Sequence, residues 1–268
     1  MLPKIILVTG ASSGFGKETA NYLATLGHVV YGTSRNEYTS ELVRMLVVDV
    51  LQPASITSAV DQIVSDQGRI DVLINNAGMG IGGAVELATP DEIDLQMRTN
   101  FGGTVAVCSA VLPIMRAQRQ GLIINTSSIA GIFGVPYQGF YSASKFAIEG
   151  YSEALSLEVA QFGVKVVIIE PGDFNTGFTG SRHISEKTQS DTDYQLSFQR
   201  VLKNIENDEQ KGDQPIFLAK QIAKIISSKH PRFRYVITSN MLQKLSVFLS
   251  KVMCARHFQW MIRLFYQV

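Results

Sequence analysis

The stretch Ile5-Ile6-Leu7-Val8-Thr9-Gly10-Ala11-Ser12-Ser13-Gly14-Phe15-Gly16 places an apolar run directly before a glycine-rich turn. This order predicts a strand, a tight turn and the start of a helix. Gly10 suits the turn, Gly14 lets the backbone approach a pyrophosphate, and Gly16 lets the helix pack closely on the strand. Free amides at the start of the helix favour an anion. Glycines also serve ordinary turns, so this stretch alone does not establish nucleotide binding.

Short apolar runs recur along the chain and alternate with stretches of helix length. Such alternation is typical of a parallel sheet with right-handed crossovers and helices on both faces. The predicted strands cover residues 4–9, 28–33, 45–48, 70–75, 121–126, 164–170 and 233–238, and the helices between them cover 14–26, 53–67, 90–118, 138–162 and 215–228. The pattern therefore predicts a single-domain, doubly wound α/β (Rossmann) fold with a parallel sheet of about seven strands.

Two segments depart from this alternation. Residues 179–213 are polar and poor in strand signals, and we expect a variable loop with a short amphipathic helix that covers a ligand or makes a surface excursion. Residues 241–268 carry apolar side chains at helical spacing. We expect residues 1–240 to form the dinucleotide-binding catalytic domain, with 179–213 as its substrate loop and 241–268 as a helical C-terminal extension.

Length and composition bound the class of protein. A chain of 268 residues with 46% hydrophobic and 18% charged residues fits one large globular domain. Cys108 and Cys254 are too few and too isolated for a disulfide framework or a zinc site, so we expect no metal and a cytoplasmic location. We expect no signal peptide, and no apolar run reaches the roughly 20 residues of a membrane span.

The positive charge is concentrated near the C-terminus. Residues 231–268 contain six Lys or Arg and no Asp or Glu, although the net charge of the whole chain is +1. These basic residues are spread among large apolar ones, unlike a basic arm that binds nucleic acid. We therefore expect no nucleic-acid partner.

The segment Tyr141-Ser142-Ala143-Ser144-Lys145 indicates proton chemistry. Residues four apart share one face of a helix, so the Lys145 ammonium can lie near the Tyr141 phenol. A fixed cation lowers the pKa of a tyrosine from its usual value of about 10 and lets the phenol act as an acid and a base. A lysine stem that packs on a tyrosine ring is the ordinary structural use of this spacing.

These motifs, taken in order, resemble the short-chain dehydrogenase/reductase family across roughly residues 4–240. Thr9 to Gly16 resembles its Thr-Gly-x-x-x-Gly-x-Gly turn, and Asn75-Asn76-Ala77-Gly78 resembles its Asn-Asn-Ala-Gly element. Residues 73–178 are similar to the branch that contains estradiol 17-beta dehydrogenase type 1 and the retinol dehydrogenases. The resemblance implies hydride transfer between the nicotinamide C4 and a carbonyl or carbinol carbon.

The resemblance also implies roles for individual residues. The implied catalytic residues are Asn100, Ser128, Tyr141 and Lys145, with Tyr141 as the general acid and base. The implied cofactor contacts are Gly10, Ser12, Ser13, Gly14, Phe15, Gly16, Ser34, Arg35, Asp49, Val50, Asn76, Ala77, Gly78, Tyr141, Lys145, Pro171, Gly172 and Thr176. Ser127 is assigned a structural role because its spacing to Tyr141 is wrong.

The end of the second predicted strand bears on the choice of cofactor. An Asp or Glu at this point binds the ribose 2′-hydroxyl of NAD, whereas an arginine accommodates the 2′-phosphate of NADP. The chain has Ser34 followed by Arg35, with Glu37 nearby. The missing acid and the arginine together favour NADP(H).

The resemblance implies an apolar ketone or secondary alcohol as substrate, such as a hydroxysteroid or a retinol-like molecule. The expected lining is Met79, Ile129, Val135, Tyr137, Phe174 and Phe178, each of which can equally be a core residue. His183 in the 179–213 segment is a candidate polar anchor. Two alternatives stay open, a 3-oxoacyl-thioester reductase and a non-enzymatic NADP-binding regulator or scaffold.

The partners follow from the same patterns. The family commonly forms dimers through the helices near residues 90 and 138, so we expect a homodimer or homotetramer. The helices after Met241 place Trp260 among apolar and basic residues, which suits peripheral contact with a membrane. Packing over the substrate cleft or against a partner subunit is the competing interpretation.

Overall fold

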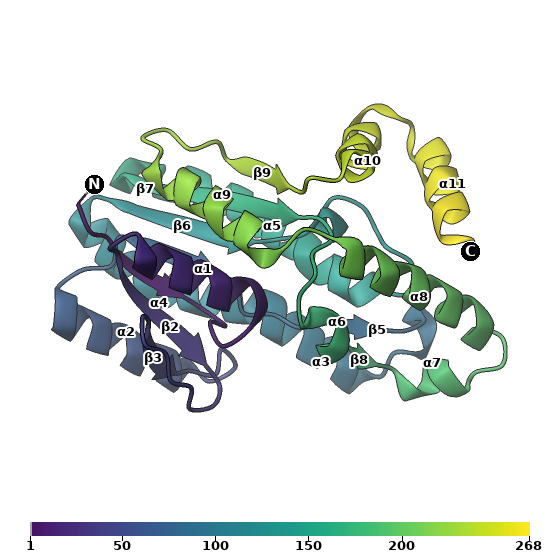
Figure 1. Ribbon diagram of the computed structural model, residues 1–268, viewed down its shortest axis with the longest axis horizontal. Helices are drawn as coiled ribbons and strands as arrows, with labels where there is room; N and C mark the ends of the chain where they lie inside the picture. Colours follow the sequence, from purple (N-terminus) through teal and green to yellow (C-terminus); the bar gives the residue numbers. More distant parts are fainter. Residues whose placement is uncertain (1) are drawn as a thin grey trace.

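A seven-stranded parallel sheet forms the centre of the molecule, in the order β3-β2-β1-β4-β6-β7-β9 (Figure 1). The computed structural model describes residues 2–268. The strands are β1 (Ile5–Val8), β2 (Val29–Ser34), β3 (Arg44–Val47), β4 (Val72–Asn75), β6 (Gly121–Thr126), β7 (Val164–Pro171) and β9 (Arg234–Ile237). The predicted parallel sheet of seven strands is confirmed, with strand ends that differ by at most two residues.

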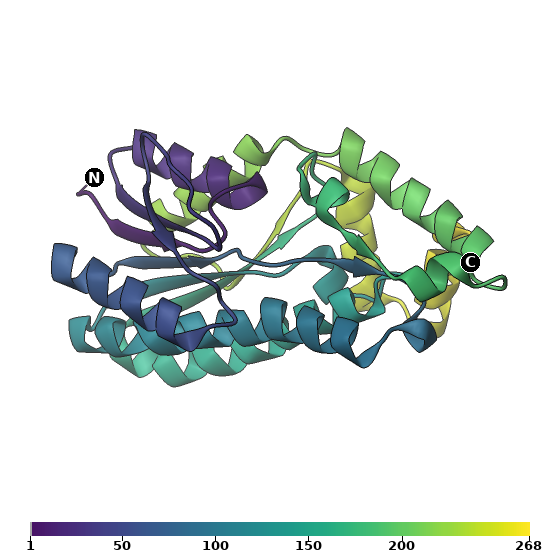
Figure 2. The ribbon, with the colours of Figure 1, turned by 90° about the horizontal axis from the view of Figure 1, so that it is seen from below.

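Helices cover both faces of this sheet (Figure 2). On β1, Ile6 and Val8 pack toward α1 and α9, whereas Ile5 and Leu7 pack toward α2, α4 and α5. Alternate side chains of a strand point to opposite faces, so a strand that is apolar throughout needs helices on both sides. These helices are α1 (Gly14–Thr25), α2 (Pro53–Gln67), α4 (Gly103–Gln118), α5 (Gly139–Val159) and α9 (Pro215–Ser227). The predicted doubly wound architecture is therefore correct.

The helix predicted over residues 90–118 is one continuous run with a widened turn inside it. It consists of α3 (Pro90–Met97), the π-helical segment η2 (Arg98–Gly102) and α4. Thr89 and Glu92 cap its start reciprocally in a capping box. A π-bulge of this kind interrupts the regular hydrogen-bond ladder and often marks a functional position. Asn100 lies within it.

This helical run bears on the expected absence of a membrane span. Within residues 2–268, Pro90–Gln118 has the length and the composition of a membrane span, with a mean hydropathy of 1.2 over its most apolar window. Polar residues, among them the buried Gln96, Asn100 and Thr104, interrupt the run, so it contains no unbroken apolar stretch of that length. Its inner side packs against the sheet through Val107, Val111 and Met115.

Residues 179–213 are more regular than expected. They contribute to α6 (Phe178–Ser181), β8 (His183–Ile184), α7 (Glu186–Ser190) and α8 (Gln195–Lys211). The strand β8 pairs with β5 (Ile81–Gly82) in a small second sheet. The predicted short helix is in fact the 17-residue α8, because Phe198, Val201 and Ile205 supply an apolar side that is buried along its length.

The predicted C-terminal helices are α10 (Met241–Val252) and α11 (Ala255–Tyr266). They lie beyond the carboxyl end of β9, at the end of the molecule opposite the amino terminus (Figure 1). The Asn240 side chain caps α10 by accepting a hydrogen bond from the Leu242 amide, 2.9 Å away. The carboxyl ends of the strands, α6 to α8 and the C-terminal helices thus gather at one end of the protein.

A buried carboxyl group lies on β7 just before this end. Glu170 is 1% exposed, its Oε1 is 3.6 Å from Arg234 Nε, and its Oε2 has no hydrogen-bond partner among the described residues. Burial raises the pKa of Glu170 to about 7, the nearby Glu149 charge adds to this, and the Arg234 charge opposes it. The folded protein therefore retains a proton on Glu170 in a pH range where the unfolded chain loses it.

This raised pKa makes stability depend on pH. Between the usual pKa of a glutamate and pH 7 the folded state binds the extra proton, so stability falls as the pH rises across this range and levels off above pH 7. We predict that Glu170→Gln reduces this fall by roughly 2 kcal/mol between pH 5 and pH 8. Thermal unfolding followed at both pH values checks it. An equal pH dependence in wild type and variant would contradict the assignment.

Candidate functional site

A cavity of about 620 Å³ lies at the carboxyl edge of the sheet. Residues that follow β1, β2, β4, β6 and β7 line it, together with side chains from α5, α8 and α11. Open α/β sheets bind their ligands at this edge, where the strand order reverses. The cavity therefore lies where the sequence predicted the functional site.

The glycine-rich turn forms one wall of the cavity. Gly10 has a φ of +67°, and a Cβ at Gly16 would lie 2.2 Å from the Gly10 carbonyl oxygen, so neither position accepts a larger residue without movement. Within residues 2–268 no side chain caps the start of α1, which leaves its first amides free for an anion. A dinucleotide pyrophosphate fits this arrangement.

Polar side chains hold the glycine turn against the next strand. The Thr9 hydroxyl accepts hydrogen bonds from the amides of Asn76 and Ala77, 2.9 and 3.0 Å away. The Asn76 side-chain amide donates in return to the carbonyl oxygens of Thr9 and Gly10. These bonds fix the separation of the two loops between which a cofactor would lie.

All the predicted cofactor contacts except one line the cavity. The lining includes Gly10, Ser12, Ser13, Gly14, Phe15, Ser34, Arg35, Asp49, Val50, Asn76, Ala77, Gly78, Tyr141, Lys145, Pro171, Gly172 and Thr176. Gly16 is the exception, because it is buried where α1 packs on the turn. Gly16 therefore lets α1 pack closely on the turn, as its position in the sequence predicted.

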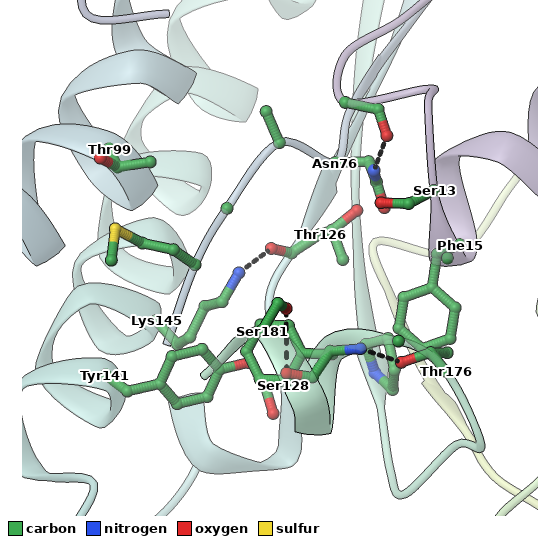
Figure 3. A pocket seen from close by; sticks show the side chains of 18 of the residues that line it. Ser13, Phe15, Asn76, Thr99, Thr126, Ser128, Tyr141, Lys145, Thr176 and Ser181 are labelled. Carbon is green, nitrogen blue, oxygen red and sulfur yellow. Dashed lines mark hydrogen bonds between the residues drawn. The ribbon is translucent and has the colours of Figure 1, made fainter. Parts of the chain in front are cut away.

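The Lys145 ammonium is buried in the cavity wall and donates a hydrogen bond to the Thr126 carbonyl oxygen, 2.8 Å away (Figure 3). Burial lowers the pKa of Lys145 to about 8, and the Glu149 charge opposes this. A buried ammonium without an acceptor costs several kcal/mol, so the hydrogen bond to Thr126 is what permits Lys145 to lie here.

Tyr141 and Lys145 lie on the same wall, as their spacing predicted. The ammonium is 5.7 Å from the centre of the Tyr141 ring. The predicted fall in the tyrosine pKa is wrong for this state of the protein. Burial raises the pKa of Tyr141 to about 12, and a hydrogen bond with Ser128 opposes this only in part. The phenol is therefore protonated at neutral pH and suited to donating a proton.

Ser128 and Asn100 occupy different positions relative to the cavity. Ser128 lines it, and its hydroxyl oxygen accepts a hydrogen bond from the Ala130 amide at 3.1 Å. Asn100 lies behind the wall and does not line the cavity. Its side chain accepts from the Met79 amide and donates to Ser144 on α5, 2.8 and 3.0 Å away. Asn100 thus ties the widened turn of the long helix to the helix that carries Tyr141 and Lys145.

Five of the six predicted substrate contacts line the cavity, namely Met79, Ile129, Val135, Phe174 and Phe178. Tyr137 does not. Its ring packs against Phe198, with centroids 5.3 Å apart, and its hydroxyl is hydrogen-bonded to Ser197. His183 also lies outside the cavity, 3.5 Å from Glu92 on α3. Phe178 packs at 5.9 Å from the Tyr141 ring, which places α6 directly over the phenol.

Three acidic residues line the cavity that the sequence analysis did not identify. Asp173 follows Pro171-Gly172, and Asp208 and Glu209 lie on α8. Burial raises the pKa of Asp173 to about 7, and the charges of Asp208 and Glu209 add to this. Glu209 forms an ion pair with Arg182, and Asp173 accepts a hydrogen bond from Gln243. Asp208 has no hydrogen-bond or ion-pair partner among residues 2–268.

Helical spacing in α8 contained a signal for these acids. The buried stripe Phe198, Val201 and Ile205 continues to residues 208 and 209, where charged side chains stand in place of apolar ones. The sequence analysis also did not identify Tyr266, although helical spacing contained a signal for it as well. It lies two turns after the buried Phe258 on α11, and it too lines the cavity. The predicted apolar lining therefore has a polar part formed by α8 and α11.

The chain belongs to the short chain dehydrogenase family, whose model matches residues 4–187. It is 56% identical to 3-ketodihydrosphingosine reductase of Bacteroides thetaiotaomicron over the full length of both chains. It is 34% identical to retinol dehydrogenase 8 of Bos taurus, over 87% of this chain and 80% of that protein. The chain is thus an oxidoreductase of the short-chain dehydrogenase/reductase class that acts on CH–OH groups or the matching carbonyls.

Solved structures agree with the fold. A short-chain dehydrogenase from Streptomyces avermitilis matches with a TM-score of 0.84 at 31% identity, covering 97% of this chain and 96% of that one. Structures with the same fold contain NAD in one case and NADP in another.

We predict that Tyr141→Phe lowers kcat by about 10² to 10⁴ with any carbonyl substrate that the wild type reduces, because general acid help has this magnitude. Cofactor affinity should change little, since the ring and its packing are kept. Steady-state oxidation of the reduced cofactor and fluorescence titration of its binding measure the two effects.

The matched control is Tyr137→Phe, which removes a hydroxyl that bonds Ser197 outside the cavity. This variant should keep near wild-type turnover. Comparable turnover in Tyr141→Phe and the wild type would exclude Tyr141 as the proton donor.

Proposed function

We propose that this protein is an NADPH-dependent reductase of a long-chain amino ketone of the 3-ketodihydrosphingosine type. The observation that carries the substrate class is the 56% identity to a 3-ketodihydrosphingosine reductase over the whole of both chains. Such a molecule has a ketone next to an amino group on a long alkyl chain. It meets the expectation of an apolar ketone, but it differs from a steroid or a retinoid in its amine.

Bound cofactor would supply the hydride from the nicotinamide C4 to the carbonyl carbon. In this mechanism Ser128 and Tyr141 hold the carbonyl oxygen by hydrogen bonds, and Tyr141 donates its proton to that oxygen as the alcohol forms. The Tyr141 pKa of about 12 keeps the phenol protonated before this step. Lys145, fixed by its hydrogen bond to Thr126, would stabilise the phenolate that remains and would hold the nicotinamide ribose.

The polar part of the cavity supports an amine-bearing substrate. Asp208 is a carboxylate without a partner among the described residues, in a cavity that also contains Tyr141 and Asp173, whereas the neighbouring Glu209 is paired with Arg182. A protonated amine next to the ketone would be attracted to this region. Met79, Ile129, Val135 and Phe178 supply apolar surface for the alkyl chain.

The same charges disfavour the thioester alternative. A 3-oxoacyl-thioester reductase would need basic residues near the cavity to receive an acidic carrier, whereas the acids at this end repel one. The scaffold alternative has no support, because Asn100, Ser128, Tyr141 and Lys145 are all present. Assembly as a homodimer or homotetramer and a cytoplasmic location stay predictions. The exposed small residues Ala143 and Gly150 on α5 would allow a close subunit contact.

The substrate proposal is tested by oxidation of NADPH with a panel of carbonyl compounds. We expect the highest kcat/KM with 3-ketodihydrosphingosine and much lower values with a 3-oxoacyl thioester, a 17-ketosteroid and retinal. Retinal or the steroid as the best substrate would replace the proposal with the retinol-like or hydroxysteroid function.

A substitution at Asp208 tests recognition of the amine. A charge-assisted hydrogen bond contributes about 1.5 to 3 kcal/mol, so Asp208→Asn should lower kcat/KM about 10- to 100-fold for the amino ketone. The value for a long-chain ketone without the amine should not change. Glu206→Gln is the control, since Glu206 is on the same helix but does not line the cavity. Equal losses with both ketones would contradict the role of Asp208.

NADP(H) is proposed as the cofactor because Arg35 lines the cavity beside Ser34 and no carboxylate from the end of β2 lines it. Arg35→Gln should lower kcat/KM for NADPH about 10- to 100-fold and leave the value for NADH nearly unchanged. Arg232→Gln, an exposed arginine outside the cavity, is the control. A wild-type preference for NADH would refute the choice of cofactor.

A further inference from the structure

The C-terminal helix pair, α10 and α11, has one side that belongs to the protein core. Val247 of α10 and Phe258 of α11 are buried. Phe258 packs on Phe133 with ring centroids 5.3 Å apart, and α11 also contacts α8. The helix pair is therefore anchored to the body of the protein by its inner side.

The outer side of the helix pair is also apolar. Trp260 and Leu264 lie one turn apart on α11 and are 61% and 58% exposed. The large exposed apolar residues of the pair include Leu242, Phe248, Val252, Trp260, Leu264 and Phe265. Soluble proteins seldom expose so many large apolar side chains together, and such a surface marks contact with a partner or a membrane. Figure 1 shows both helices on the outside of the molecule, past the end of β9.

The charges of the helix pair are all of one sign. Lys244, Lys251, Arg256 and Arg263 lie on it, and no Asp or Glu occurs between residues 231 and 268. None of these four forms an ion pair with an acidic side chain within residues 2–268. Arg256 and Arg263 lie about one helical turn before and after Trp260, so cations flank the exposed tryptophan along the helix. Apolar and aromatic residues bordered by lysine and arginine are typical of helices that lie at a membrane surface.

We infer that the outer side of the helix pair docks on the surface of an anionic lipid bilayer. Charge complementarity selects this occupant, because lysine and arginine near anionic lipid each contribute to binding. A second copy of the chain is a poorer occupant. A two-fold contact through this side would bring two sets of like charges together without any acid to neutralise them.

The helix pair adjoins the cavity, because Tyr266 at the end of α11 lines it together with Asp208 and Glu209 of α8. This step rests on the proposed function. A long-chain amino ketone is poorly soluble in water and resides in membranes, so the docked helix pair would hold the substrate end of the cavity next to the bilayer. The alkyl chain could then enter the cavity without crossing bulk water.

Sedimentation of the full-length protein with vesicles tests the docking. The vesicles are phosphatidylcholine alone or phosphatidylcholine with about one third phosphatidylglycerol. We expect most of the wild type to sediment with the anionic vesicles and little with the neutral ones. The double variant Trp260→Glu with Leu264→Glu should stay in the supernatant and keep its fold, because both side chains are exposed. Leu26→Glu, an exposed leucine at the far end of α1, should behave like the wild type.

Three outcomes would overturn the inference. One is wild-type protein that stays in the supernatant with anionic vesicles, and another is a double variant that sediments as well as the wild type. The third is a double variant whose mass by light scattering falls to that of a monomer while the wild type is larger, since the outer side would then be a subunit interface.

The entry of substrate from the bilayer has a separate readout. The double variant should lower kcat/KM at least 10-fold for the long-chain amino ketone presented in anionic vesicles, and leave it unchanged for a short-chain, water-soluble analogue. Equal kcat/KM in both proteins with the vesicle substrate would contradict entry from the membrane. Wild-type sedimentation without reduction of either ketone would reject the proposed function and leave the docking intact.

Discussion

The hydrogen bond from the Lys145 ammonium to the Thr126 carbonyl oxygen is the interaction on which the site depends. This bond joins α5 to the carboxyl end of β6. The Thr126 carbonyl oxygen is the acceptor that makes burial of the Lys145 cation tolerable. With Lys145 fixed, Tyr141 one turn earlier is held over the cavity beside Ser128. The Asn100 side chain restrains the same helix from behind, through Ser144. The positions of the reacting groups therefore follow from one buried charge and its partners.

The two ends of the cavity have different physical characters. At one end, backbone amides, glycines and Arg35 suit the phosphates and ribose of a dinucleotide, and they belong to the first strands of the sheet. At the other end, Phe178, Asp208 and Tyr266 come from segments late in the chain that fold over the carboxyl edge. Tyr141 and Lys145 lie between the two sets. A fold shared by the family would thus bind the cofactor, while the late segments α6, α8 and α11 would decide which carbonyl compound is accepted.

Much of the fold was predictable because its strands are buried on both sides. A run such as Ile5 to Val8 is apolar throughout, which is the pattern that a central parallel strand requires. The glycine turn and the spacing of Tyr141 and Lys145 likewise depend on local geometry. The length of α8 was not predictable in the same way, because its burial depends on Val135 and Tyr266, which are distant in sequence.

The residue types of the site were predictable from the sequence, whereas the direction of the Tyr141 pKa shift and the acidic side chains in the cavity were not. Spacing alone suggested that Lys145 lowers the Tyr141 pKa, yet burial raises this pKa, and a hydrogen bond with Ser128 opposes the rise only in part. The acids of the cavity were missed because Asp208 and Glu209 on an isolated helix are expected to face solvent. Only the packing of α8 and α11 over the strand ends brings them to the cavity. Local pattern gives the residues of a site, whereas pKa values and substrate contacts depend on what tertiary structure buries.

The most direct test of the account is the fate of the nicotinamide hydrogen. NADPH carrying deuterium at both positions of C4 is incubated with the protein and 3-ketodihydrosphingosine in ordinary water, and the product is analysed by mass spectrometry and NMR. The account predicts one deuterium on the carbon that carried the ketone and a proton from solvent on the new hydroxyl. A product without deuterium at that carbon, or no reduced product at all, would contradict it.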